Sequence, residues 1–408
     1  MKVIYDIEIF KNYLLFGFLE TESQEEKYFE FSERKLEYDE LVEYLRHVKQ
    51  MIGFNNISFD YPLLYHFLSL VQSKKYKMST IVGLCKTYSD ILVRSKYPSR
   101  IPQLIPQIDL RLIHHYNNKA KMTSLKQLEF FMRMKNVQDL PIEHDEIVPL
   151  DKMDEVIFYN QNDLFATYEF YRKHSLGHIS LREELSERFN IDMTNFNDVK
   201  IGESILVSKL KSALEKDELG QTNREIIKFK DVIFPYVSFE SSDLNQFLNW
   251  LKTREIKETK GAFTDIPNKN LTEILPIIDI SKSNLKRKPR KVTIEKYQDL
   301  LEYPEIEIKS LTINFKGNQI TYGTGGVHQA TYGNFFTNEN YIVKSFDVKS
   351  YYPSMMITNN IYPLHLGPTF CTTMNDIKIE RSKYPKGSVL NKALKLSGNG
   401  SYGCLNCI

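Results

Sequence analysis

The sequence is poor in cysteine and tryptophan and has no long apolar run. It holds four cysteines and one tryptophan in 408 residues. So few cysteines exclude a disulfide scaffold for this length and fit a reducing cytoplasm. No apolar run approaches the ~18 residues of a membrane-spanning helix. Asp6 and Glu8 interrupt the N-terminal segment, where a secretion signal needs an apolar core. We therefore expect a cytoplasmic protein with no membrane partner.

A strong net charge is also absent. The chain has 54 basic and 52 acidic residues, a formal charge of +2. This balance neither predicts nor excludes nucleic-acid binding, because enzymes that act on DNA combine basic grooves with acidic metal sites. Six basic residues crowd around Pro289 between Lys282 and Lys291. They indicate either a solvated loop or an arm that contacts a phosphate backbone.

Apolar and aromatic residues are plentiful. The apolar share of 42%, with 25 Tyr and 25 Phe, excludes global disorder, and the length predicts two or three domains. β-rich runs at 3–7, 13–19 and 51–54 alternate with helical stretches at 124–134 and 153–172, which indicates an α/β fold. We expect a hairpin between the first two runs, a strand at 341–348 and helices that begin near Pro353 and Ser388. Changes of pattern place domain boundaries near residues 185 and 335.

Two acidic residues of the first predicted strand share one face. Asp6 and Glu8 are two residues apart, and a strand alternates its side chains between faces. Val3, Ile4 and Ile7 beside them are typical of a core. Carboxylates that converge in this way hold hard divalent cations. By themselves the two acids could equally belong to the polar face of an edge strand.

Two further segments complete an acidic pattern. Asp60 lies at a predicted strand-to-helix junction, and Tyr159 and Asp163 lie four residues apart on a predicted helix, hence on one face. Four acids on three elements suit phosphodiester hydrolysis by two metals. In that chemistry two cations ~3.5–4 Å apart bind the phosphate, activate water and stabilise the leaving oxygen. The Tyr159 hydroxyl can orient the attacking water.

The segments Asp6-Ile-Glu8, Asn56-Ile-Ser-Phe59-Asp60 and Tyr159-Asn-Gln-Asn-Asp163 resemble the three exonuclease motifs of family B DNA polymerases. The resemblance implies an RNase H-like 3′–5′ proofreading domain over residues 1–185. It also implies two Mg²⁺ or Mn²⁺ ions per active site, held by Asp6, Glu8, Asp60 and Asp163, with Tyr159 assisting the water.

The resemblance extends to contacts with a single-stranded primer end. Ser124 and Leu125 begin a segment that fits the family's Ser/Thr-Leu-x-x-hydrophobic element, which holds that end. The positions of Asn56 and Phe59 carry similar roles in the family. Considered alone, Ser124 more simply predicts a helix cap.

A second constellation lies near residue 350. Asp347-Val-Lys-Ser350-Tyr-Tyr352-Pro-Ser354 resembles polymerase motif A, Asp-x-x-Ser-x-Tyr-Pro-Ser, at every fixed position. The resemblance implies that Asp347 binds both catalytic metals. It also implies that Tyr352 packs under the sugar and rejects a 2′-hydroxyl. A lone Asp at a strand end is otherwise a turn or cap residue.

The segment from Lys395 to Gly403 resembles polymerase motif B, Lys-x-x-x-Asn-Ser/Gly-x-Tyr-Gly. Helical spacing places Lys395, Asn399 and Tyr402 on one face. The resemblance implies contacts of Lys395 and of Arg381 with an incoming deoxynucleoside triphosphate. Gly398 and Gly400 would let a base pair lie close to the backbone. A glycine-containing helix end is the alternative. The Gly-rich segment 322–328 and residues 362–368 also look like phage members of the family.

The resemblance spans most of the chain but not a whole polymerase. The last Asp of the sequence is Asp376, so the acidic motif C of family members is missing, as is the thumb. Cys404 and Cys407 form a Cys-x-x-Cys pair, but structural zinc needs four ligands. We expect instead that an intron, a frameshift or a split gene interrupts the coding here.

Three functions follow from these observations. The first is an N-terminal portion of a phage-type replicative DNA polymerase with a proofreading exonuclease, a connecting region (186–335), a partial palm (336–370) and partial fingers (371–408). The second is a free-standing 3′–5′ exonuclease with a non-catalytic polymerase remnant. The third is an inactive remnant or DNA-binding module. Expected partners are DNA, deoxynucleoside triphosphates and, as a hypothesis, a second polypeptide with the rest of the palm and the thumb.

Overall fold

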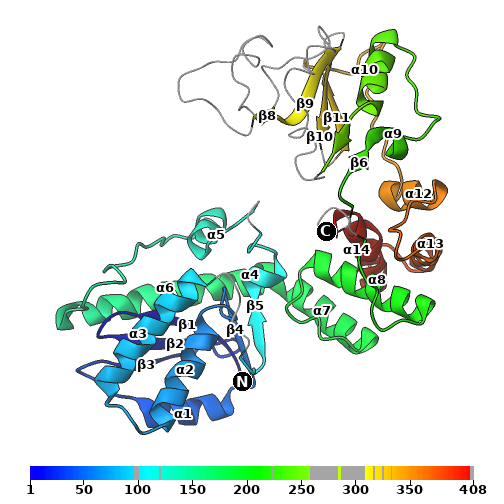
Figure 1. Ribbon diagram of the computed structural model, residues 1–408. Helices are drawn as coiled ribbons and strands as arrows, with labels where there is room; N and C mark the ends of the chain where they lie inside the picture. Colours follow the sequence, from blue (N-terminus) through cyan, green and yellow to red (C-terminus); the bar gives the residue numbers. More distant parts are fainter. Residues whose placement is uncertain are drawn as a thin grey trace. The chain divides into compact units, whose positions relative to one another are not determined.

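The computed structural model describes residues 1–95, 101–118, 121–222, 224–257, 284–285, 308–315, 318–323, 326–331 and 333–404. The chain forms two compact units, and each is described by itself (Figure 1). Unit 1 comprises Met1–Leu210 and Thr373–Ser401, whereas unit 2 comprises Lys211–Thr372 and Tyr402–Ile408. The expected α/β class is confirmed, because unit 1 is built on a mixed sheet with helices on both faces.

The sheet of unit 1 has five strands in the order β3-β2-β1-β4-β5. The strands are β1 (Lys2–Ile9), β2 (Leu14–Glu20), β3 (Glu26–Phe31), β4 (Gln50–Gly53) and β5 (Gln107–Asp109). β2 runs antiparallel to β1 and β3, as expected for a hairpin, while β4 is parallel to β1 and to β5. β1 is therefore a central strand with a neighbour on each side.

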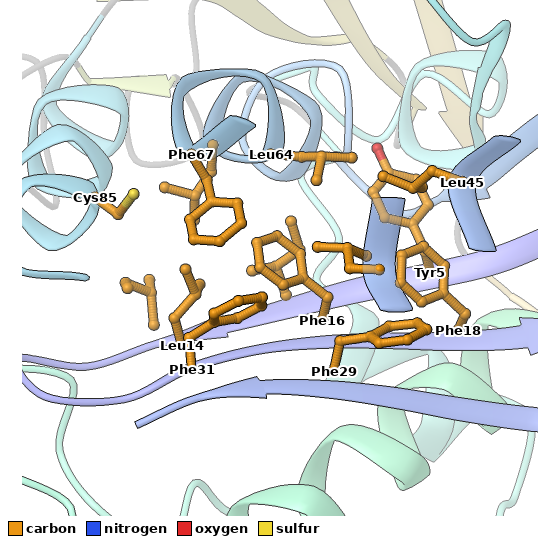
Figure 2. Packing of buried hydrophobic residues seen from close by; sticks show 14 of the residues in the cluster. Tyr5, Leu14, Phe16, Phe18, Phe29, Phe31, Leu45, Leu64, Phe67 and Cys85 are labelled. Carbon is orange, nitrogen blue, oxygen red and sulfur yellow. The ribbon is translucent and has the colours of Figure 1, made fainter. Parts of the chain in front are cut away.

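Three helices cover one face of this sheet. They are α1 (Tyr38–His47), α2 (Asp60–Gln72) and α3 (Met78–Arg94). Val3, Tyr5 and Ile7 of β1 point into this layer and are almost fully buried. Figure 2 shows the aromatic rings at its centre, where Phe67 of α2 lies 4.5 Å from Phe31 and 5.1 Å from Phe16, measured between ring centroids. Each buried ring of this kind contributes about 1.5–3 kcal/mol relative to an exposed one.

A nearly continuous helical segment covers the other face. It consists of α6 (Met153–Phe170), a π-helical turn (Tyr171–Ser175) and α7 (Leu176–Phe189). Within this turn the hydroxyl of Ser175 donates a hydrogen bond of 3.2 Å to the carbonyl of Phe170. α4 (Leu110–Ile113) and α5 (Leu125–Phe131) add to this layer. Ile4 of β1 is buried here, and by strand alternation Asp6 and Glu8 belong to the same face.

Unit 1 also contains a helix from the far end of the chain. α8 (Asp198–Leu214) and α14 (Val389–Cys404) pack so closely that a Cβ on Gly202 would lie 2.3 Å from the Leu396 carbonyl oxygen. Leu185 of α7, Ile201 of α8 and Ala393 of α14 share one apolar cluster. The predicted boundary near residue 185 thus falls inside α7, and part of the segment expected as fingers lies in unit 1.

Unit 2 holds a four-stranded sheet in the order β11-β10-β9-β8. Its strands are β8 (Asn284–Leu285), β9 (Ile308–Phe315), β10 (Asn318–Gly323) and β11 (Gly326–Thr331). β10 and β11 pair antiparallel, so the Gly-rich segment 322–328 spans a hairpin whose residues 324–325 lie outside the described part. Most of the basic segment 282–291, and Cys407, lie outside it as well.

The remaining elements of unit 2 are short. They are β6 (Ile227–Lys228), α9 (Phe229–Val232), α10 (Ser242–Lys252), β7 (Glu255–Ile256), α12 (Tyr351–Thr358) and the start of α13 (Thr369–Ser382), which continues into unit 1. Across the described residues, no helix is both long and apolar enough to cross a bilayer.

The expected strand at 341–348 is wrong. These residues form no helix or strand, and the side chains of Tyr341, Ile342, Phe346 and Val348 are exposed. A strand needs a neighbour to accept its backbone hydrogen bonds. Among the described residues none pairs with this segment, so a strand-like composition yields only extended chain.

Candidate active site

Three carboxylates of unit 1 converge on one point. Asp6, Glu8 and Asp163 each place a carboxylate oxygen within 4.8 Å of the other two. β1 supplies the first two and α6 the third. The alternation of β1 turns Asp6 and Glu8 towards the helix that carries Asp163, as the sequence pattern predicts.

Asp60 contacts the same strand, β1, from the N-terminus of α2. It is the first residue of α2, and its Oδ1 accepts a hydrogen bond of 3.2 Å from the backbone N–H of Ile7, between Asp6 and Glu8. Its side chain is almost fully buried. The structure therefore gathers all four expected acids around the centre of β1.

The loop before Asp60 is fixed by a buried acid that the sequence analysis did not single out. Asp109 ends β5 and is fully buried. Its carboxylate accepts hydrogen bonds from the backbone N–H groups of Asn55 at 3.1 Å and Ile57 at 3.2 Å. Asn55 has a positive φ of 72°. Asp109 thus holds the strained turn that delivers Asp60.

Tyr159 lies one helical turn before Asp163 and is half-buried. Its hydroxyl is hydrogen-bonded to the Asp163 carboxyl group. Burial, and then the negative charge of Asp163, raise the pKa of Tyr159 above its ordinary value. The phenol therefore stays protonated at neutral pH and can donate a hydrogen bond.

The four acids suppress each other's ionisation. Burial raises the pKa of Asp6 to about 6, and burial with the charge of Asp6 raises the pKa of Asp163 to about 8. Burial also raises the pKa of Glu8 and of Asp60, with the charge of Asp6 as the next cause. Like charges in a desolvated site cost free energy that a bound cation would remove. An all-carboxylate oxygen donor set fits Mg²⁺ or Mn²⁺.

A fifth carboxyl group adjoins this cluster. Glu129 of α5 is almost fully buried and is hydrogen-bonded to Asp163. Asn162 Nδ2 donates a hydrogen bond of 3.2 Å to Glu129 Oε1. A single acid among the apolar residues of 125–131 was the available signal in the sequence. Its contact with Asp163 could not be read from the sequence, because it depends on how α5 packs against α6.

The residues expected to contact a DNA end occupy different environments. Ser124 is exposed and caps α5 in a capping box with Gln127, whereas Leu125 and Phe59 are half-buried. Asn56 is fully buried against Gln107. In this conformation Asn56 offers no surface to a DNA strand. The DNA contacts of all four residues stay predictions.

An aromatic surface borders Ser124. Phe130 and Phe131 at the end of α5 are 73% and 70% exposed. They line a surface pocket of about 420 Å³ together with Ser124, Lys126, Gln127 and Val137. We call this pocket the α5 aromatic surface. Four basic side chains are exposed within and beside it: Lys121, Lys126, Arg133 and Lys135.

The expected polymerase residues are divided between the units. In unit 2, Asp347 is exposed in the unpaired segment and Tyr352 is 39% exposed on α12. In unit 1, Lys395 and Asn399 are exposed one turn apart on α14, and Arg381 is half-buried near the end of α13. The backbones of Tyr402 and Gly403 belong to α14, and the side chain of Tyr402 lies outside the described part.

No protein-family model matches the chain, and no curated protein matches it either.

Proposed function

We propose that unit 1 is a metal-dependent 3′–5′ DNA exonuclease with an RNase H-like fold. The whole chain would be part of a family B DNA polymerase in which this unit proofreads. The observation that carries the proposal is the convergence of Asp6, Glu8 and Asp163 within 4.8 Å, with Asp60 held at the Ile7 amide between the first two. Two-metal hydrolysis uses acids from several elements that lie around one point, and this arrangement supports the proposal.

Asp6, Glu8, Asp60 and Asp163 would hold the cations. When bound, two divalent ions lower the pKa of water and stabilise charge on the phosphate and the leaving oxygen. The protein supplies rigid placement. β1 has sheet neighbours on both sides, and α6 packs across its acidic face, so the carboxylates need little reorganisation before they bind.

Tyr159 would orient the attacking water. Its hydroxyl already lies in the acidic cluster, through the hydrogen bond to Asp163, and its raised pKa keeps the proton on the phenol. A protonated phenol can donate to one oxygen and accept from another. This role needs positioning but no proton transfer from Tyr159.

The α5 aromatic surface would receive the single-stranded 3′ end. Bases stack on exposed aromatic rings without regard to sequence, and cations beside the rings follow the phosphates. Phe130 and Phe131 provide the rings, with Lys126 next to them. The same helix carries Glu129, which is hydrogen-bonded to Asp163. A strand held on α5 would therefore lie near the acidic cluster.

The polymerase activity is the second part of the proposal. Asp347 would bind metal, Tyr352 would select the deoxyribose, and Arg381, Lys395 and Asn399 would bind the triphosphate, with Tyr402 and Gly403 beside the nascent pair. The exposure of Lys395 and Asn399 on one face of α14 supports a binding role for them. The segment 341–348 would gain its sheet neighbours from a second polypeptide with the rest of the palm.

The proposal is tested with 5′-labelled single-stranded DNA and Mg²⁺ or Mn²⁺. The chain should shorten the DNA from its 3′ end, and the double variant Asp6→Ala/Glu8→Ala should lose this activity while it stays folded. A matched control is Asp39→Ala/Glu40→Ala, which removes two acids from the first turn of α1. Equal activity in the two double variants would contradict the assignment of the site.

A further inference from the structure

Asn160 is a buried polar residue of unit 1 to which the proposed chemistry gives no role. It follows Tyr159 on α6 and is fully buried. Its Nδ2 donates a hydrogen bond of 2.8 Å to Asp6 Oδ2. The same amide lowers the pKa of Glu8, against the larger effect of burial. One side chain of the opposite layer thus acts on both acids of β1.

The other end of this amide has no partner. Asn160 Oδ1 is buried and makes no hydrogen bond with the described residues. A buried oxygen without a partner costs free energy. An apolar side chain of the same size would avoid this cost, so the amide is explained by what its donor end does at Asp6 and Glu8.

Gly17 makes room for this amide. It lies on β2 directly opposite Asp6 in the antiparallel register. A Cβ added to Gly17 would lie 1.8 Å from Asn160 Oδ1 and 2.9 Å from its Cγ. No side chain fits at position 17 while Asn160 keeps its place. Three elements therefore meet at this contact: β1 with its acids, β2 with a bare backbone, and α6 with the amide.

We propose that Asn160 is a positioning residue that holds Asp6 and Glu8 parallel for cation binding, in a space left free by Gly17. This inference depends on the proposed function, because it assigns the amide a role in the same metal site. The amide N–H disperses negative charge between two carboxylates that lack a nearby cationic side chain among the described residues. It also fixes the rotamer of Asp6, as partners of metal ligands generally do.

The first test compares two isosteric or near-isosteric changes on neighbouring positions of α6. Asn160→Leu keeps the branching and the number of side-chain heavy atoms and removes the donor. Gln161→Leu removes the adjacent amide, which reaches Glu26 at the surface. We expect the Mn²⁺ dissociation constant, measured by isothermal titration calorimetry on the full chain, to rise about 10- to 100-fold in Asn160→Leu and to stay unchanged in Gln161→Leu. High Mn²⁺ should restore most of the exonuclease turnover of Asn160→Leu.

The second test uses Gly17. Gly17→Ala alone should weaken Mn²⁺ binding about as much as Asn160→Leu, because the new methyl group displaces the amide. In an Asn160→Ala background the same change should cost little further, because the space is then free. This cycle stays informative even if Asn160→Leu fails to fold.

The outcomes separate the two claims. If the wild-type chain binds Mn²⁺ and Asn160→Leu binds it equally well, the role of Asn160 is overturned while the metal site stands. Additive losses from Gly17→Ala and Asn160→Ala would overturn it as well. A wild-type chain that binds no Mn²⁺ would overturn both the inference and the proposed function.

Discussion

Asp6 and Asp347 resemble each other in sequence, but their surroundings in the structure are opposite. Each follows apolar residues, and each was expected on a strand as a metal ligand. Around Asp6, Val3 and Ile4 are fully buried and β1 is paired on both sides. Around Asp347, Phe346 is 88% and Val348 59% exposed, and the segment pairs with no described strand.

The difference teaches that a motif supplies the right residue types, whereas pairing with neighbouring strands fixes them in the geometry of a site. In β1 the pairing of Asp6 and Glu8 with β2 fixes the direction of each carboxylate, and β4 pairs with residues 2–4 just before them. Residues 341–348 have the composition of a buried strand but lack that fixation. The structure therefore shows a preformed acidic cluster at Asp6 and an unpaired segment at Asp347.

The largest expected effect is a complete absence of primer extension by this chain. With the proposed nuclease removed by Asp6→Ala/Glu8→Ala, the chain alone should not extend a primer, because a two-metal site needs acids held together on fixed elements and 341–348 has no described neighbour. The measurement is extension of a labelled primer on a template. Templated extension by this single chain, abolished by Asp347→Ala, would show that the segment assembles without a partner polypeptide.

The next contrast lies inside the preformed site. Tyr159→Phe should keep Mn²⁺ binding and lose roughly 10- to 1,000-fold in exonuclease rate, the range for one positioned group. Asp163→Ala should lose more and should also weaken Mn²⁺ binding, while Asp347→Ala should change neither. Equal losses for Tyr159→Phe and Asp163→Ala would mean that the tyrosine does more than orient water.

A smaller effect is expected at the α5 aromatic surface. Phe130→Ala/Phe131→Ala should raise KM for single-stranded DNA about 5- to 150-fold, since stacking is worth ~1–3 kcal/mol per base, and should leave kcat nearly unchanged. Phe165→Ala, which truncates an exposed ring on α6, is the matched control. A loss confined to kcat, or the same rise in KM with the control, would remove the surface from the substrate path.

The smallest effect is on stability. The carboxyl of Asp163 titrates near 4 when unfolded, whereas burial and the charge of Asp6 raise its pKa to about 8 in the folded state. Between these values the folded state binds more protons, so stability falls as pH rises from about 4 to 8. In EDTA, Tm should be several degrees lower at pH 8 than at pH 5, and Mg²⁺ should reverse this loss. Asp163→Asn should reduce the pH dependence, whereas Asp347→Asn should leave it unchanged.

Much of the acidic cluster was predictable because it follows local rules. A two-residue spacing on a strand placed Asp6 and Glu8 together, and a four-residue spacing placed Tyr159 above Asp163. Contacts between distant segments were not predictable. Asn160 reaches Asp6 across 154 positions of sequence, and it does so only because Gly17 of a third element leaves space.

The wrong strand has the same cause. Composition predicted a strand at 341–348 because it cannot tell whether a neighbouring strand exists. The packing of α14 against Leu185 and Ile201, from more than 180 positions away, likewise could not be read from the sequence. Sequence patterns report the preference of a segment, and packing partners decide whether it is realised.

The return of α14 also constrains how unit 1 can form during synthesis. The ribosome must synthesise most of the chain before Ala393 can pack against Leu185 and Ile201. Until then the apolar side chains of Leu185 and Ile201 are exposed to solvent. Closing such a long loop is slow relative to local contacts. A chain truncated after residue 210 should therefore aggregate and be degraded quickly. Co-expression of a peptide that spans Val389–Cys404 should restore its stability.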